Sequence, residues 1–368
     1  MKFARPSSQP NKAVPTKISD LHIALEEPLP PPRDLREELP VSEAEAAHVA
    51  ASRSVVVDIL RGRDHRLLVV AGPCSIHEPE SASEYARRLR DFAPRVSDAL
   101  FLVMRVYFEK PRTRMGWKGL IYDPELNGHG NIREGLRHAR RILLNCARMG
   151  VPAASEILDL VTPQYYAELL TWGAIGARTT ESPLHRQMAS ALSAPVGFKN
   201  PMNGNVQTAV DAILAATQPH KFPSISLDGR AVVVTTTGNP HCHLVLRGAG
   251  DRPNYDASSV EAAAGALVQA ALPPRLMVDC SHDNSGKDPI RQSVVAADVT
   301  AQIAAGSSAI CGVMLESHLI EGRQEIVNGR RGLRYGQSVT DACIGWETTV
   351  EVLDRLADAV RRGSRKED

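Results

Sequence analysis

Eight short apolar runs that alternate with helix-like segments predict an α/β protein, a (β/α)8 TIM barrel of eight parallel strands. The runs are almost continuously apolar, as strands buried on both faces must be. An open, doubly wound sheet is the main alternative, but no GxGxxG sequence follows the first run. The 368 residues, 43% of them hydrophobic, are enough to build a core of this size.

We expect residues 1–65 to form an extension ahead of the barrel. Residues 1–19 are polar and rich in turn formers, which predicts a disordered start. The proline-rich stretch LEEPLPPPRDLREELP then predicts an extended arm rather than a core element. After it, Ser42 stands three residues before Glu45 as in a capping box, and apolar residues recur at helical spacing. Residues 43–61 are therefore predicted to form a helix.

The barrel itself is expected to occupy residues 66–368. Its strands correspond, in order, to the runs RLLVVAGPCS, ALFLVMRV, VPAASEIL, AIGARTTES, APVGFKN, CHLVLRG, RLMVDCSH and AICGVMLES. In the segment NIREGLRHARRILLNCARMG, Cys146 shares one helical face with the apolar residues, so we interpret it as a packing residue.

One segment interrupts the alternation of strands and helices. FPSISLDGRAVVVTT contains two β-rich runs joined by Asp228 and Gly229. An Asp-Gly pair between such runs is a strong signal for a β-hairpin. We therefore expect a hairpin around residues 222–237, inserted between the fifth and sixth barrel units.

The overall composition gives no reason to expect a nucleic-acid or membrane partner. Lys and Arg total 43 against 42 acidic residues, for a net charge of +1. No apolar run approaches the roughly 20 residues of a membrane helix, and the first residues lack the apolar core of a secretory signal. The six cysteines are scattered rather than arranged as a disulfide framework, so we expect a cytoplasmic protein.

The end of each apolar run carries a residue that can be ionised or can bind a metal. In (β/α)8 barrels the chemistry lies at the C-terminal ends of the strands. A chance selection of strand ends would include Ser, Thr, Asn and apolar residues. The eight residues are Cys74, Arg105, Glu156, Arg178, Lys199, Arg247, His282 and Glu316.

The cations of this set predict a polyanionic substrate. Arginine offers a planar fork to a phosphate or carboxylate, and lysine a point charge. So many cations around one barrel mouth would repel one another without an anionic ligand. The alternative is that each cation pairs with a surface carboxylate. The cations are Arg105, Lys110, Arg178, Lys199 and Arg247.

The remaining residues suggest a metal site. Cys74, His282, Glu316 and, in SVTDACIGWE, Asp341 together offer a thiolate, an imidazole and two carboxylates. This mixture of soft and hard ligands suits a divalent transition metal, and Mn, Fe, Co and Zn all remain possible. Taken singly, a buried histidine is more often a hydrogen-bonded core residue, and a cysteine a small apolar residue. Cys74 could also be a nucleophile.

The sequence resembles the class I 3-deoxy-D-arabino-heptulosonate 7-phosphate (DAHP) synthases over roughly residues 20–360. The resemblance implies a (β/α)8 barrel with one divalent metal ion per subunit. It also implies condensation of phosphoenolpyruvate with D-erythrose 4-phosphate, the first step of the shikimate pathway. The motifs that carry it are GPCSIH, MRVYFEKPRT, GWKGL, WGAIGARTTES, PVGFKN, ILAA, HLVLRG, DCSHDNSGK, GVMLESHL and TDACIGWE.

The resemblance implies a role for each matched position. The metal ligands would be Cys74, His282, Glu316 and Asp341. Phosphoenolpyruvate would be held by Arg105, Lys110, Glu156, Arg178, Lys199 and Arg247. Arg112 and Thr113 would bind the phosphate of the sugar, and Lys110 would join Cys74 and His282 as a catalytic residue. The sequence after GFKN departs from the usual family sequence at Pro201, Met202 and Asn203. None of the metal or substrate ligands named above is lost by this departure.

The resemblance also implies feedback inhibition by an aromatic amino acid, bound at a subunit interface of a homo-oligomer, dimer or tetramer. Ser224 favours phenylalanine or tryptophan over tyrosine as the effector. For Ser193, ordinary turn chemistry is the favoured alternative. The matched residues of the effector site are Asp20, Pro163, Gln164, Ser193, Phe222 and Ser224.

Two alternative functions remain at this point. One is a related synthase that condenses phosphoenolpyruvate with another sugar phosphate. The other is a catalytically silent homologue kept as a regulatory subunit. The second would require the loss of a ligand or a cation, and every matched position retains its residue.

Overall fold

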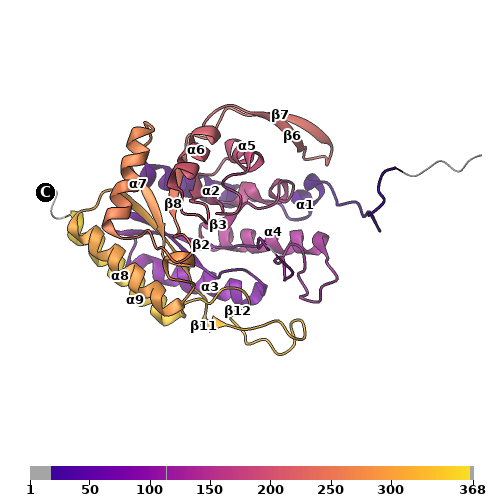
Figure 1. The fold of residues 1–368 in the computed structure, drawn as a ribbon. Coiled ribbons are helices and arrows are strands. Elements are labelled where there is room, and N and C mark those ends of the chain that lie inside the picture. The colour runs from indigo at the N-terminus through magenta and orange to yellow at the C-terminus, as the bar shows by residue number, and fades with distance from the viewer. Residues whose placement is uncertain (1–17, 113, 365–368) are drawn as a thin grey trace, which may run out of the picture.

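Eight parallel strands close into a barrel in the order β1-β10-β9-β8-β5-β4-β3-β2, in a computed structural model that describes residues 18–112 and 114–364. The (β/α)8 prediction is confirmed (Figure 1). The barrel strands are β1 Leu67–Gly72, β2 Leu100–Arg105, β3 Ala153–Glu156, β4 Trp172–Ile175, β5 Val196–Lys199, β8 Cys242–Leu246, β9 Leu276–Asp279 and β10 Ile310–Glu316.

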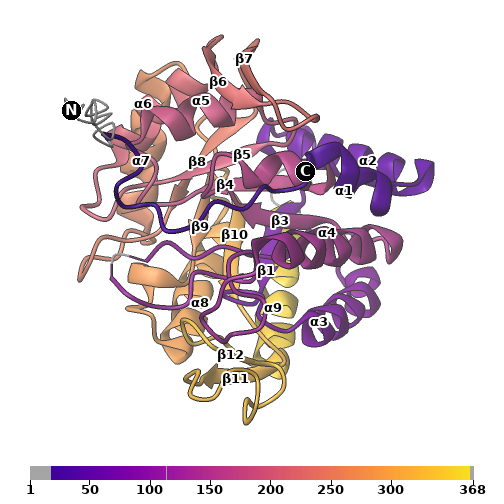
Figure 2. The same ribbon diagram turned by 90° about the vertical axis from the view of Figure 1, so that its right-hand side faces the viewer.

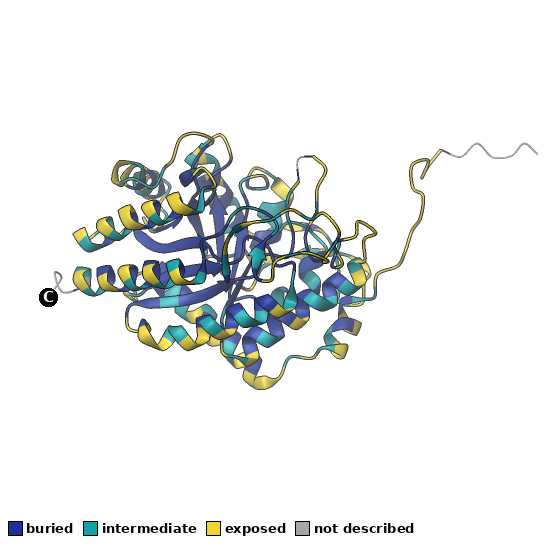
Figure 3. Cartoon of the chain, turned by 90° about the horizontal axis from the view of Figure 1, so that it is seen from below, coloured by how far each residue is buried: buried dark blue, intermediate teal, exposed yellow. Residues whose placement is uncertain are grey.

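Helices surround the strands, and each turns one face to them and the other to solvent (Figure 3). The connection from β3 to β4 is the exception, because two short 3-10 turns, η2 Thr162–Tyr165 and η3 Ala167–Leu169, take the place of an α-helix. On α4, Cys146 is buried, as predicted. The outer helices are α3 Pro79–Phe92, α4 Ile132–Arg148, α5 Pro183–Ala191, α6 Val206–Ala216, α7 Ala257–Gln269, α8 Pro289–Ala305 and α9 Trp346–Ser364.

Helix α2, Glu43–Leu60, has the predicted capping box: Ser42 Oγ accepts from the amide of Glu45, and Glu45 Oε2 accepts from the amide of Ser42 at 2.6 Å. Its buried face, which includes Val56 and Ile59, belongs to the same apolar cluster as side chains of β1, β2 and β4. The helix therefore packs against the side chains that fill the barrel.

The prediction of an extended arm was wrong for residues 32–38, which form helix α1, Pro32–Glu38. A proline has no backbone N–H, but an N–H in the first turn of a helix has no acceptor within the helix, so a proline there costs no hydrogen bond. The residues that follow are good helix formers. Leu35 is buried beneath the helix, and Arg36 Nη2 donates to the carbonyl of Gln164. The arm ahead of α1 has no regular structure and extends away from the barrel (Figure 1). The predicted disordered start falls almost entirely outside the described residues.

The predicted hairpin consists of β6, Lys221–Ile225, and β7, Ala231–Thr235, which pair in antiparallel fashion between α6 and β8. Gly229 in its turn has a φ of 71°, a conformation that favours glycine. The amide of Arg33 in α1 donates to the carbonyl of Leu227, so α1 contacts the turn of the hairpin (Figure 2). A smaller pair, β11 Ile320–Arg323 and β12 Gln337–Ser338, follows β10. Among the described residues, no helix is long and apolar enough to span a membrane.

Candidate functional site

The structure brings the predicted strand-end residues to one end of the barrel. Arg105, Glu156, Lys199 and Glu316 are the last residues of β2, β3, β5 and β10. The other four follow their strands within three residues. They are Cys74, Arg178, Arg247 and His282.

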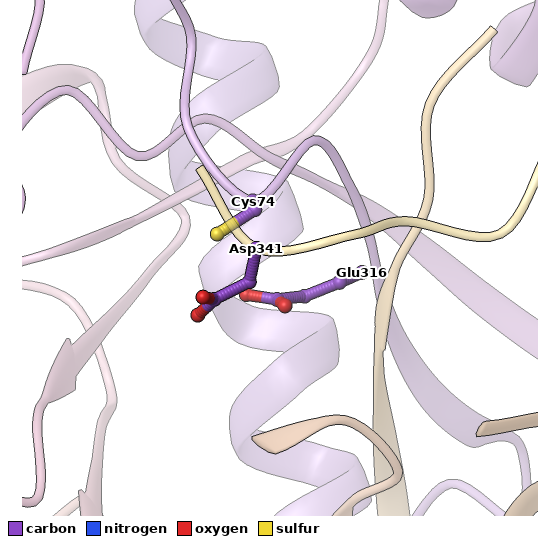
Figure 4. Close-up of side chains that lie close together, drawn as sticks. All are labelled: Cys74, Glu316 and Asp341. Carbon is purple, nitrogen blue, oxygen red and sulfur yellow. The ribbon is translucent and has the colours of Figure 1, made fainter. Parts of the chain in front are cut away.

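Cys74, Glu316 and Asp341 lie close together at this end of the barrel (Figure 4). One ligand atom from each lies within 4.8 Å of the others. Nε2 of His282 lies 3.6 Å from Glu316 Oε1, so the histidine borders this trio rather than completing it at the same spacing. A thiol, two carboxylates and an adjacent imidazole fit a divalent transition metal.

His282 is oriented by a buried carboxylate. Its Nδ1 lies 2.8 Å from Oδ2 of Asp279, which is fully buried at the end of β9. A carboxylate on one ring nitrogen is the usual way to direct the other nitrogen toward a metal. His282 also has a φ of 54°, a conformation rare for residues with a side chain. The backbone and Asp279 together turn Nε2 toward Glu316.

Lys110, one of the predicted cations, contacts a predicted metal ligand. Its Nζ lies 3.1 Å from Cys74 Sγ and 3.2 Å from the carbonyl of Cys74. Burial, and after it the charge of Glu316, raises the pKa of the Cys74 thiol. Burial opposes ionisation of Asp341, but Lys110 and Lys287 outweigh it and lower the pKa of that carboxyl. Of these two groups, the thiol is therefore the one whose ionisation needs a further cation.

Three of the predicted anion-binding cations form ion pairs with buried carboxylates, not with surface ones. Arg105 Nη2 donates to Glu316 Oε1 at 2.9 Å, and Lys199 Nζ donates to Asp279 Oδ2 at 2.7 Å. Arg247 forms the third pair with a carboxylate in the β9-α8 connection, Asp283. The alternative of simple surface pairing is thus excluded for these three, since all six side chains are at most 10% exposed.

These pairs leave donors of two arginines without an acceptor. Within residues 18–112 and 114–364, no group accepts a hydrogen bond from the buried Nε of Arg105 or of Arg247. A buried donor without an acceptor costs about 1–3 kcal/mol. Both arginines are therefore suited to an anion that supplies oxygen acceptors at this end of the barrel.

The remaining predicted substrate residues differ in their exposure. Arg178 is exposed, whereas Glu156 is buried against Gly176, where an added Cβ would lie 3.0 Å from the Glu156 Cδ. Arg112 is exposed, and its Nε donates to the carbonyl of Trp117 at 2.9 Å. Thr113 lies outside the described residues.

The predicted effector residues are only partly brought together. Phe222 and Ser224 of β6 line an apolar cavity of about 100 Å³, along with residues of the β3-β4 connection and α5. Pro163 and Gln164 lie two and three residues after Val161, which lines the same cavity. Ser193 lines a different cavity at the start of β5, and Asp20 lies exposed in the arm.

The sequence reasoning missed the carboxylates that hold the cations, Asp279 and Asp283, and also Gln292 of α8. Gln292 accepts from the amide of Glu316 and donates to its carbonyl, and so fixes the end of β10. Asp279 could have been found, because it ends the apolar run RLMVD three residues before His282. Nothing in the sequence pattern indicates the partners of Asp283 and Gln292, since both contacts depend on tertiary structure.

The sequence model of the DAHP synthetase I family matches residues 38–354, which include all eight barrel strands. The chain belongs to the DAHP synthetase I family. The resemblance expected from the motifs is thereby confirmed.

Individual relatives in the DAHP synthetase I family match almost end to end. The chain is 52% identical over 339 residues to the Tyr-sensitive phospho-2-dehydro-3-deoxyheptonate aldolase of Salmonella typhimurium, covering 92% of this chain and 95% of that one. It is 53% identical over 346 residues to the Phe-sensitive enzyme of Escherichia coli K12, covering 94% and 98%. The solved structure of the Francisella tularensis aldolase superposes with a TM-score of 0.90 at 47% identity, covering 93% and 99%.

If Cys74 is a metal ligand, Cys74→Ala will lose bound metal and turnover while the barrel remains folded. Cys146→Ala is the matched control, since it removes a buried thiol of α4 that is not among the predicted ligands and should retain both at a cost of about 1 kcal/mol in stability. Metal content by emission spectrometry, turnover and thermal unfolding would be measured on each variant. A Cys74→Ala protein with normal metal content and full turnover would refute the assignment.

Proposed function

We propose that the chain is a 3-deoxy-7-phosphoheptulonate synthase, which condenses phosphoenolpyruvate with D-erythrose 4-phosphate to give DAHP and phosphate. The observation that carries the proposal is the set of buried arginine donors without acceptors at the end of the barrel that also carries the Cys74, Glu316 and Asp341 trio. The relatives named phospho-2-dehydro-3-deoxyheptonate aldolase support it over nearly the whole chain.

Phosphoenolpyruvate is proposed to lie among the cations at the strand ends. Arg178 and Arg247 hold mainly its phosphate, with Glu156 beside that group. Because Arg105, Lys199 and Arg247 are buried, their charges act on the ligand with little screening by water. The whole set comprises Arg105, Lys110, Glu156, Arg178, Lys199 and Arg247.

The sugar phosphate is proposed to enter from the more open side. Arg112 is exposed and can bind the phosphate of erythrose 4-phosphate together with Thr113. The two substrates are both polyanions, so the surrounding cations offset their repulsion and fix their relative orientation. This brings the methylene carbon of phosphoenolpyruvate to the aldehyde carbon.

Cys74, His282, Glu316 and Asp341 are proposed to hold one divalent ion, Mn, Fe, Co or Zn. When bound, such an ion polarises the aldehyde oxygen as a Lewis acid. Lys110, whose Nζ lies beside Cys74, is placed to serve both substrates and to deliver a proton to the developing alkoxide. Attack on the aldehyde leaves carbon 2 of phosphoenolpyruvate electron-poor, so it accepts water before phosphate departs.

We also propose regulation, assembly and location for this enzyme. The Tyr- and Phe-sensitive relatives support an aromatic amino acid effector, and the apolar cavity lined by Phe222 offers apolar contacts to an aromatic ring. The effector site is proposed to be completed at a subunit interface of a homo-oligomer. Cytoplasmic location is proposed because six free cysteines, including Cys74, persist best in a reducing compartment.

Purified protein supplied with phosphoenolpyruvate and erythrose 4-phosphate should release phosphate and form DAHP. Arabinose 5-phosphate should support much slower turnover, because a longer sugar phosphate cannot satisfy the same phosphate and aldehyde contacts together. Steady-state assays with each sugar would be compared. Preference for arabinose 5-phosphate would favour the related synthase, and no turnover with either would favour a silent homologue.

At least one of phenylalanine, tyrosine and tryptophan should inhibit the enzyme. Phe222→Ala should weaken that inhibition and leave the uninhibited rate unchanged, because it removes an aromatic wall of the cavity. Val233→Ala, an exposed position on the same hairpin, is the control. Inhibition by none of the three amino acids would contradict the regulatory proposal.

A further inference from the structure

Arg247 is held by a carboxylate from the neighbouring strand connection. Nη1 of Arg247 donates to Oδ2 of Asp283, the residue after His282. The two side chains are 5% and 10% exposed. Water screens such a pair much less than a surface pair, so the carboxylate fixes the rotation of the guanidinium.

The opposite edge of the same guanidinium is unsatisfied. Nε of Arg247 is buried and finds no acceptor in the described part of the chain. Nε and the second terminal nitrogen form one planar fork, of the kind that binds two oxygens of a phosphate. Asp283 therefore occupies one side of the guanidinium and leaves the fork available to a ligand.

Asp283 also fixes the loop that follows Arg247. The amide of Gly250 donates to Asp283 Oδ2 at 2.8 Å. Gly248 has a φ of 81°, and a Cβ there would lie 2.6 Å from the amide nitrogen of Asn284. The loop thus packs directly on the backbone beside Asp283, and one carboxylate joins the arginine and the loop to the end of β9.

The backbone of Arg247 has a separate support. Its amide donates to Oδ1 of Asn200 at 2.9 Å, and Asn200 Nδ2 donates to the carbonyl of Gly248 at 3.0 Å. Loss of the Asp283 carboxylate would therefore leave the main chain of Arg247 in place. Its guanidinium would become free to rotate, and the amide of Gly250 would lose its side-chain acceptor.

We propose that Asp283 is a positioning residue for phosphoenolpyruvate, which holds Arg247 so that its open fork faces the phosphate. The inference rests on the proposed function and adds an orienting carboxylate to that site. Whether Asp283 strengthens or weakens the binding of phosphoenolpyruvate distinguishes orientation from charge. Through charge alone, a carboxylate beside the phosphate would weaken binding, so any benefit to binding must come from orientation.

The test compares steady-state kinetics of the full-length wild type, Asp283→Ala and Asp283→Asn. The KM for phosphoenolpyruvate should rise roughly tenfold in Asp283→Ala, and less in Asp283→Asn, because an amide oxygen can still accept from Arg247 and Gly250. The kcat and the KM for erythrose 4-phosphate should stay within about twofold of wild type. Inhibition by inorganic phosphate should weaken in parallel with phosphoenolpyruvate binding.

Asp251→Ala is the matched control, because it removes an exposed carboxylate from the same loop, and it should behave as wild type. A lower KM for phosphoenolpyruvate in Asp283→Ala would overturn the inference and show that the carboxylate repels the phosphate. Unchanged constants would also overturn it, as would equal losses for both substrates together with lower thermal stability. A wild type without turnover would refute the proposed function itself, and this inference with it.

Discussion

The buried ion pair between Arg105 and Glu316 is the interaction on which the rest of the site depends. Arg105 ends β2 and Glu316 ends β10, and these two strands flank β1, which leads to Cys74. The pair joins a proposed phosphoenolpyruvate ligand to a proposed metal ligand at 2.9 Å. Removing one partner of a buried pair costs about 3–5 kcal/mol, because it leaves the other charge uncompensated. Each half of the site therefore stabilises the other.

Closure of the barrel makes this arrangement possible. Parallel strands all end at the same side, so residues distant in the sequence meet there without long loops. This is why the sequence predicted both the fold and the residues at the strand ends. The fold follows from the alternation of apolar runs with helical segments, and the site residues follow from the residue at the end of each run. The capping box at Ser42 and the Asp-Gly turn of the hairpin were predictable for the same reason, because each depends on neighbours in the sequence.

The features that sequence reasoning missed depend on tertiary contacts. Helix α1 forms where Leu35 can be buried, although the prolines ahead of it indicate an extended arm. The orientation of His282 depends on Asp279 and on a left-handed backbone, neither of which periodicity reveals. Ser193 matches a family position, yet it lines a cavity away from Phe222. The sequence thus predicted which strand end a residue occupies better than it predicted which residues that side chain contacts.

Hydrogen bonds connect the start of η2, next to the cavity lined by Phe222, to the residue before Lys110. Asp159 accepts from the amides of residues 161 and 162 at the start of η2, and Thr162 Oγ1 donates to Glu109, the neighbour of Lys110. Burial and the nearby Asp159 raise the pKa of Glu109 to about 8. Thr162, which follows the cavity residue Val161, therefore contacts the chain neighbour of the proposed catalytic lysine.

The central claim is that the strand ends hold a metal beside the proposed phosphoenolpyruvate site. The most direct measurement is turnover after a strong chelator has removed bound metal, and again after Mn, Fe, Co or Zn is restored. Loss of turnover on chelation and recovery with at least one of these ions is the predicted result. Turnover that is unaffected by complete removal of metal would contradict the account.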